Sequence, residues 1–180
     1  MNKRYILTFG SSNSSKSINK QLAQHAGRLI SKQTIKLVDL RDFDLPIYSP
    51  DLEQEIGIPA NASKFSELIE HSSGIILSLA EHNGSYTAVF KNIFDWMSRI
   101  DQKVWKNKPM LLLATSPGRR GGSSVLTTAV QQFPHFDGNI VAHFSLPSFH
   151  SNFSENGIED TELSNKFNNT VELYNQHLAQ

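Results

Sequence analysis

The sequence predicts an α/β protein in which helices cover both faces of one parallel sheet. Short apolar runs alternate along the chain with segments of helical periodicity, and most of the runs are apolar at consecutive positions. Continuous apolar runs are typical of strands that are buried on both faces, and alternating strands and helices form right-handed βαβ units. The 180 residues fit one domain, so we expect a single domain over residues 1–180.

Five apolar runs are the expected strands: residues 5–9, 36–40, 74–79, 110–114 and 139–146. Apolar residues recur at helical spacing in five other segments, which are 18–29, 65–72, 86–97, 125–133 and 163–178. The stretch 41–59 contains three prolines and several acidic residues, and we expect it to be a long ordered loop.

Composition excludes several classes of protein. Basic and acidic residues number 17 each, so a dedicated nucleic-acid or anionic-membrane binder is not expected. A near-neutral surface favours self-association. The chain has no cysteine, and the spacing of its seven histidines does not suit a metal, so no metal site is expected. No run approaches the ~20 apolar residues of a membrane helix, and the first apolar run is too short for a signal peptide. We expect a soluble cytoplasmic protein.

Ligands of an open parallel sheet bind beyond the carboxyl ends of its strands. The first loop there, residues 10–17, is rich in serine, contains Lys16 and leads into a helix N-terminus. Free N–H groups and the helix dipole favour an anion at such a place. An ordinary solvated loop with a serine cap would have the same composition, and neither Gly-x-Gly-x-x-Gly nor a P-loop pattern is present.

The second and third loops also have two interpretations each. In residues 80–86, Asn83-Gly84 permits positive φ and exposes backbone amides to a flat polar ring, or it forms a plain strand-to-helix turn with Ser85 near the cap. In residues 115–123, glycines allow close approach of a ligand, and Arg119 and Arg120 can pair with phosphate. The alternative is a flexible surface loop with solvated arginines.

Taken together, the three loops resemble the NAD(P)H-dependent FMN reductase family, which has a flavodoxin-like fold. The resemblance covers roughly residues 4–146 and rests on three motifs in the family's order and spacing: Gly10-Ser11 with Ser17-x-Asn19, residues 81–86 running into 91–96, and Ser116-Pro117-Gly118 followed by Arg-Gly-Gly. It implies a three-layer sandwich around a five-stranded parallel sheet of order 2-1-3-4-5.

The resemblance also implies an enzyme that binds FMN and takes hydride from NADPH or NADH. The acceptor would be small, such as a quinone, free flavin, an azo compound or a metal oxyanion. The flavin carries the chemistry, so no catalytic side chain is expected. Arg119 and Arg120 are the expected contacts to NAD(P)H. The expected cofactor-binding residues are Ser11, Ser12, Ser17, Asn19, Glu81, His82, Asn83, Gly84, Ser85, Ser116 and Gly118.

Three residues depart from the family pattern. Ser12 stands where arginine is common, His82 where tyrosine is usual, and Ala80 where proline is frequent. The loss of arginine removes a charged contact, and the loss of proline predicts a looser entry to the second loop. His82 can donate a hydrogen bond to flavin or substrate. We read Asp39 as a weak candidate for a ribose-binding acid and His25 as a residue of a helix surface.

Two rival functions have sequence features that argue against them. A flavodoxin-like electron carrier without NAD(P)H turnover is typically acidic, whereas this chain is neutral. A scaffold protein should have lost the three loops. Family members are usually dimers or tetramers, which agrees with the broad aromatic stripe of residues 90–97. We therefore expect a homodimer or homotetramer that uses this helix.

Overall fold

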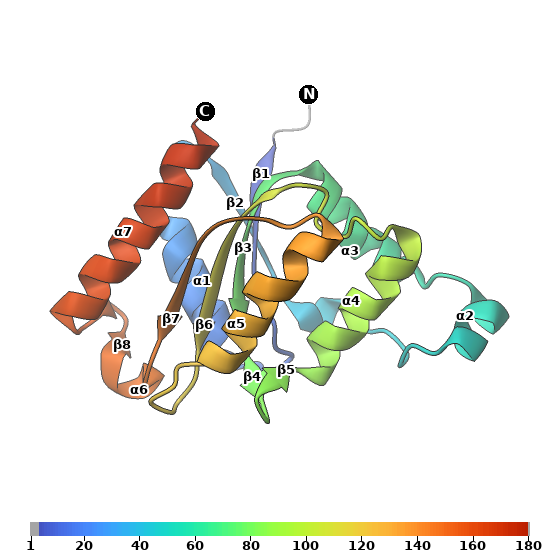
Figure 1. Ribbon diagram of the computed structural model, residues 1–180, viewed down its shortest axis with the longest axis horizontal. Helices are drawn as coiled ribbons and strands as arrows, with labels where there is room; N and C mark the ends of the chain where they lie inside the picture. Colours follow the sequence, from blue (N-terminus) through green and yellow to red (C-terminus); the bar gives the residue numbers. More distant parts are fainter. Residues whose placement is uncertain (1–3, 180) are drawn as a thin grey trace.

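The computed structural model describes residues 4–179 and contains the predicted parallel sheet. Its five strands lie in the order β2-β1-β3-β6-β7, and all of their pairings are parallel. The predicted order 2-1-3-4-5 is therefore confirmed (Figure 1). The strands are β1 (Tyr5–Gly10), β2 (Thr34–Val38), β3 (Ser72–Leu79), β6 (Pro109–Thr115) and β7 (Asn139–Leu146).

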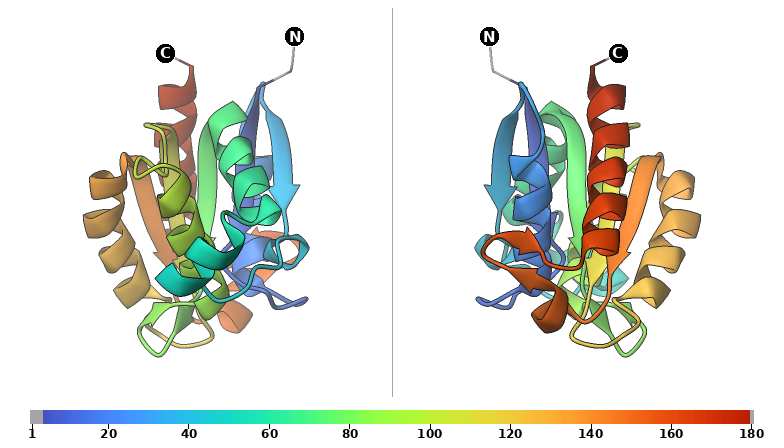
Figure 2. Two further views of the ribbon diagram at one scale, coloured as in Figure 1. Left: turned by 90° about the vertical axis from the view of Figure 1, so that its right-hand side faces the viewer. Right: turned by 90° about the vertical axis from the view of Figure 1, so that its left-hand side faces the viewer.

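Helices cover both faces of this sheet, as Figures 1 and 2 show. On one face lie α1 (Ile18–Arg28) and α7 (Thr161–Leu178), and on the other lie α3 (Ala60–His71), α4 (Ala88–Ile100) and α5 (Ser123–Gln132). Successive strand residues alternate between the two cores: Ile76 packs under α1 and α7, whereas Ile75 and Leu77 face the other layer. The strand residues that point to either face of the sheet are apolar, and this explains the continuous apolar runs.

The stretch 41–59 is not a loop throughout, so that expectation is wrong over one helical segment. Residues Pro50–Ile56 form α2, which begins at Ser49, whose Oγ accepts a hydrogen bond from the Leu52 N–H (3.1 Å). Proline is well tolerated in the first helical turn because its missing N–H is not needed there. No residue of α2 is buried, and the helix stands out from the body in Figure 1.

The aromatic stripe on α4 is buried within the chain. Phe90, Phe94 and Trp96 are at most 4% exposed. Phe94 stacks on Trp105 at 5.6 Å between ring centroids, and the Trp96 Nε1 donates to the Pro46 carbonyl (2.8 Å). The segment before α2 therefore covers the surface that the sequence analysis assigned to a partner. The expectation that this aromatic stripe is free to contact a second copy was therefore wrong.

Short elements complete the chain. They are η1 (Leu40–Asp42), β4 (Glu81–His82), β5 (Ser85–Tyr86), η2 (Phe133–Phe136), α6 (Phe149–Asn152), β8 (Phe153–Ser154) and β9 (Gly157–Ile158).

The His25 ring stacks on Phe167 and meets Phe153 edge-on, each at 5.4 Å, and a Cβ on Gly157 would lie 2.6 Å from it. His25 is thus half-buried rather than a surface residue, and burial lowers its pKa. Among residues 4–179, no helix is long and apolar enough to cross a bilayer.

Asp39 ties the end of β2 to α1. Its carboxylate lies 2.5 Å from the Lys20 Nζ and 2.8 Å from the Arg41 Nη2, and the Arg41 Nε and backbone N–H also donate to it. Hydrogen bonds from Arg41, followed by those from Lys20, hold the pKa of Asp39 far below its usual range. This carboxylate is engaged within the fold, which argues against the ribose-binding role considered for it.

Replacing Asp39 by Asn should lower the free energy of unfolding by roughly 1–2 kcal/mol at pH 7, because partly exposed ion pairs contribute little each. The folded pKa is depressed below the ordinary ~3.9, so this contribution is complete above about pH 5 and declines as the pH falls below about 4. Urea unfolding at pH 7, 5, 4 and 3 measures it. A difference between wild type and Asp39→Asn that stays constant down to pH 3 would contradict the assignment.

Candidate functional site

The three loops expected to bind a ligand lie together at one end of the molecule. They leave the carboxyl ends of β1, β3 and β6, opposite the end of the molecule where β1 begins and α7 ends in Figure 1. The chain runs from β1 to β2 on one side and returns to β3 on the other side of β1. The strand order therefore reverses between β1 and β3, which is where ligands of open parallel sheets bind.

Ser11 joins the first loop to the second. It is fully buried. Its N–H donates to the Ser78 carbonyl (2.9 Å), its Oγ accepts from the Ala80 N–H (2.8 Å), and its carbonyl accepts from the Thr87 Oγ1 (2.6 Å). The expected looser entry at Ala80 is therefore wrong: the alanine supplies an N–H that proline lacks, and this N–H tightens the second loop against the first.

Asn19 ties the start of α1 to two strand ends. Asn19 is only 3% exposed. The Oδ1 accepts from the Ser78 Oγ (2.8 Å) and the Thr115 N–H (3.0 Å), and the Nδ2 donates to the Thr115 carbonyl (3.0 Å). The amide thus pairs with Thr115 as a neighbouring peptide group would. Its donor and acceptor are engaged inside the protein, so its role is to hold the site together.

The amino end of α1 offers the donors that a phosphate needs. The Ser17 Oγ accepts from the Lys20 N–H (3.1 Å), which leaves the N–H groups of Ile18 and Asn19 at the open helix end. A Cβ on Gly10 would lie 2.4 Å from the Lys20 N, so only glycine lets the loop fold back this closely. Amides, hydroxyls and a helix dipole make a donor set that fits a phosphate monoester such as that of FMN.

Ser12 and the residues after it form the outer wall of this loop. Ser12 is half-buried, and its Oγ accepts from the Ser14 N–H (3.1 Å). The Ser14 Oγ in turn accepts from the Lys16 N–H (3.2 Å), and Asn13 to Lys16 are exposed. The Ser12 hydroxyl thus shapes the turn of this loop.

The second loop is a two-residue β-hairpin. Strands β4 and β5 pair antiparallel around Asn83 and Gly84, whose φ values are +52° and +77°. Positive φ at both positions is the signature of the type I′ turn that Asn-Gly favours. His82 to Ser85 are exposed at its tip. The Thr87 Oγ1 accepts from the Phe90 N–H (3.3 Å), so Thr87, not Ser85, caps α4.

Glu81 joins the second loop to the third through its side chain, a role that the sequence analysis missed. Its carboxylate is about 10% exposed, and the Oε2 accepts from the Val125 N–H (3.0 Å) in the first turn of α5. The Arg120 Nη2 lies 3.9 Å from the Oε1. A carboxylate at a helix N-terminus is favourable, but nothing local in the sequence connects residues 44 positions apart.

The third loop is anchored along its backbone. The Gly118 carbonyl accepts from the Ser148 N–H (2.9 Å), and the Ser116 carbonyl accepts from the Phe149 N–H (3.0 Å). Gly121 adopts φ +59°, and a Cβ on it would lie 2.6 Å from the Ser145 Oγ. This backbone is therefore held against the end of β7, while the side chains of Arg119 and Arg120 are exposed. These two side chains line a cavity of about 670 Å³ between α5, β7 and α7.

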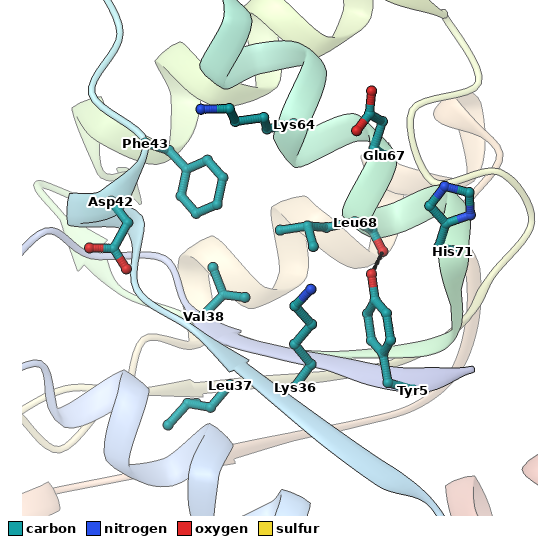
Figure 3. A pocket seen from close by; sticks show the side chains of 10 residues that line it. All are labelled: Tyr5, Lys36, Leu37, Val38, Asp42, Phe43, Lys64, Glu67, Leu68 and His71. Carbon is teal, nitrogen blue, oxygen red and sulfur yellow. Dashed lines mark hydrogen bonds between the residues drawn. The ribbon is translucent and has the colours of Figure 1, made fainter. Parts of the chain in front are cut away.

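A second cavity lies at the opposite edge of the sheet, away from the predicted site residues. It has a volume of about 580 Å³, lies beside β2 and α3, and contains none of those residues (Figure 3). The Tyr5 hydroxyl donates to the Leu68 carbonyl (3.0 Å), and the Lys36 Nζ lies 4.8 Å from the centre of the Tyr5 ring. Within residues 4–179, no three His, Asp or Glu side chains gather where they could hold a metal ion.

Comparison with known proteins agrees with this arrangement. A family model described as NADPH-dependent FMN reductase matches residues 5–151. The chain belongs to the NADPH-dependent FMN reductase family. The description of this oxidoreductase family names FMN and NADPH, which confirms the resemblance drawn from the three loops.

Relatives support the same family. A quinone reductase of Escherichia coli (strain K12) is 31% identical over 108 residues, which cover 54% of this chain and 57% of that protein. NAD(P)H-dependent FMN reductase PA1204 of Pseudomonas aeruginosa is 31% identical over 117 residues, which cover 64% of this chain and 62% of that protein. The chain thus matches somewhat over half the length of these curated relatives.

A solved structure supports the flavodoxin-like fold. FerB, a flavoenzyme NAD(P)H:(acceptor) oxidoreductase from Paracoccus denitrificans, has a TM-score of 0.77 at 23% identity, covering 98% of this chain and 97% of that chain. In the present chain, the three predicted loops meet at the switch point of the sheet. Ser11, Asn19 and Glu81 hold these loops to one another and to the strand ends.

Removal of the Asn19 amide should be strongly destabilising. Asn19→Ala leaves the Thr115 N–H and carbonyl and the Ser78 hydroxyl without their buried partner, so we expect a loss of about 2–4 kcal/mol in the free energy of unfolding. Chemical denaturation measures it. Asn169→Ala, at an exposed position of α7, is the control and should change stability by less than about 0.5 kcal/mol. Equal effects of the two substitutions would show that the Asn19 contacts contribute nothing.

Proposed function

We propose that the chain is an FMN-dependent oxidoreductase that takes hydride from NADPH or NADH and passes it to a small acceptor. The observation that carries the proposal is the set of three mutually locked loops at the switch point, one of them ending at an open helix N-terminus. The names of several relatives, quinone reductase among them, favour a quinone as acceptor. Free flavin, azo compounds and metal oxyanions are the other acceptors to test.

In this proposal each loop holds one part of FMN. The N–H groups at the start of α1, with Ser12, Ser17 and the exposed Lys16, bind the phosphate. The hairpin from Glu81 to Ser85 lies along one edge of the flavin ring, chiefly through its backbone. Ser116 and Gly118 close the other side. FMN, when bound, supplies the redox chemistry, and the protein supplies orientation, exclusion of water and electrostatics.

The charges around the hairpin suit a ring that gains negative charge on reduction. Backbone N–H groups of the hairpin stabilise such a charge without rearrangement. The carboxylate of Glu81 would oppose it, but the Val125 N–H (3.0 Å) and the nearby Arg120 (3.9 Å) offset that charge. The alternative of an electron carrier without NAD(P)H turnover has no supporting observation beyond the shared fold.

We also propose that the protein is at least a homodimer and acts in the cytoplasm. The zero net charge supports self-association. The buried stripe of α4 no longer supports it, whereas the α2 arm does, because Ile47 and Ile56 are 86% and 50% exposed and no residue of α2 is buried. We therefore expect the arm, residues 46–56, to contact a second copy.

FMN retention tests the first loop. Ser17→Asp keeps a good helix cap but places a negative charge beside the phosphate, so FMN should be lost on gel filtration. Ser17→Asn caps equally well without charge and should retain the yellow cofactor. Normal FMN binding by Ser17→Asp, measured by flavin fluorescence, would remove the phosphate from this loop.

Light scattering at micromolar concentration should give at least the mass of a dimer for the wild-type protein. The double variant Ile47→Glu/Ile56→Glu should shift it to a monomer, because charges replace apolar contacts across the interface. Leu173→Glu, at an exposed position on α7 (58% exposed), is the control and should keep the wild-type mass. A monomeric wild type would refute the interface.

Anaerobic flavin reduction separates the enzyme from the carrier. Arg119→Ala/Arg120→Ala should raise KM for the nucleotide and leave FMN affinity nearly intact. Loss of a charge-assisted contact of roughly 1.5–3 kcal/mol lowers kcat/KM by about ten- to a hundredfold. Dithionite, which needs no binding site, should reduce both proteins equally. Wild-type rates in the double variant would leave the arginines without a role, and a wild type that neither nucleotide reduces would establish the carrier.

A further inference from the structure

The cavity between α5, β7 and α7 combines cations with apolar surface, and the proposed flavin site uses only Arg120 of these residues, through its contact with Glu81. Its volume of about 670 Å³ lies within the range of small-molecule sites. Its cationic and imidazole side chains are Arg119, Arg120, Lys166 and His143. Its apolar walls are formed by Leu126, Val130, Phe144 and Leu163. This mixture suits a ligand with a flat ring and a compact negative group.

The cations come from two sides of the cavity. Arg119 and Arg120 belong to the third loop, whose backbone is held where the Ser145 Oγ donates to the Gly121 carbonyl (3.0 Å). Lys166 faces them from α7 and lies 2.5 Å from Glu162. Both members of that pair are more than 60% exposed. An exposed pair on one helix contributes little free energy, so Lys166 can exchange Glu162 for a phosphate.

The outer edge of β7 adds backbone groups to this cavity. Among the described residues, β7 pairs with β6 and with no strand on its other side. Alternate peptide groups on such an edge point outward, with an N–H donor near a C=O acceptor. Adenine presents the complementary acceptor and donor on one edge of its ring.

The cavity at the opposite edge of the sheet lacks this combination. Lys36 and Lys64 line it, but Asp42 and Glu67 stand among them (Figure 3). Lys36 also lies over the Tyr5 ring. The mixed charges there do not favour a phosphate dianion, whereas the residues that line the β7 cavity include three cations and no carboxylate. Glu81 lies 3.9 Å from Arg120, and Glu162 pairs with Lys166, but neither is a lining residue.

We propose that the β7 cavity binds the adenosine 2′-phosphate half of NADPH. Adenine lies against the apolar wall and the open strand edge, and Arg119, Lys166 and His143 surround the 2′-phosphate. The inference rests on the proposed function, because the nicotinamide must reach the flavin. One side of the third loop, with Ser116 and Gly118, borders the proposed flavin site, and its other side, with the two arginines, borders the cavity. A single dinucleotide can therefore bind across this loop, and the site selects NADPH over NADH.

Titration calorimetry of the FMN-loaded protein with adenosine 2′,5′-bisphosphate and with AMP tests this site. The bisphosphate should bind at least tenfold more tightly than AMP, and Lys166→Gln should reduce that ratio by about tenfold. Lys64→Gln removes a lysine from the cavity beside β2 and should leave the ratio unchanged. Equal affinities for the two nucleotides, or an unchanged ratio in Lys166→Gln, would overturn the proposal.

Two neighbouring threonines of α5 give a matched pair of variants. Thr127 lines the cavity, whereas Thr128 does not, and both are exposed. Thr127→Glu should repel the 2′-phosphate and abolish tight binding of the bisphosphate, and Thr128→Glu should keep it. Equal losses in both variants would place the ligand elsewhere.

Anaerobic reduction by NADPH, measured on the same samples, separates this proposal from the proposed function. Flavin reduction without a preference for the bisphosphate overturns the adenosine site and leaves the function. A bisphosphate preference that Thr127→Glu abolishes, without flavin reduction, keeps the site and overturns the function.

Discussion

The buried amide of Asn19 is the contact on which the functional end of this protein depends. It holds the start of α1 to the ends of β3 and β6 through three hydrogen bonds of 2.8–3.0 Å. Each buried donor or acceptor left without a partner costs about 1–3 kcal/mol, so these strand ends cannot separate from the helix cheaply. In the same way, Ser11 holds the first loop to the second, and Glu81 holds the second loop to the third. Ser145 then holds the third loop to β7.

Because side chains of the loops hold one another, the contacts left for a ligand are mainly backbone N–H groups and exposed hydroxyls. A backbone donor does not depend on which side chain stands above it. The expected departures at Ser12 and His82 therefore need not remove these backbone donors. Ala80 adds a backbone contact between the first two loops, since its N–H donates to the Ser11 Oγ (2.8 Å).

The sequence predicts the layers of this fold well because both cores are built from periodic apolar residues. Strand order, in contrast, came from the resemblance, since periodicity does not determine which strands are neighbours. The three prolines of residues 41–59 led to the expectation of a loop where α2 lies, although Ser49-Pro50 is a helix-start signal. The aromatic stripe on α4 was predicted, but periodicity cannot say what covers it. Its cover includes the Pro46 carbonyl, 50 positions away from Trp96.

The side-chain contacts that hold the three loops together could not be predicted from the sequence. The sequence placed Ser11 and Glu81 in loops that meet and Asn19 at the start of the helix after the first loop, but their partners lie 44 to 96 positions away. No local pattern connects residues at such separations. His25 shows the same limit on a smaller scale, because the rings that bury it come from β8 and α7.

The charge of this site is uneven although the chain as a whole is neutral. At the end of β2, the carboxylate of Asp39 binds both Lys20 and Arg41, so positive charge there is balanced. In the loop between β6 and α5, Arg120 is 76% exposed and lies 3.9 Å from the Glu81 carboxylate, a loose pair. The pairing pattern rather than the net charge therefore decides where positive charge stays exposed, and it does so at the arginines of the third loop. The proposed function follows this division: it assigns the phosphate of FMN to the hydroxyl-rich first loop and the phosphates of the nucleotide to the arginines of the third loop.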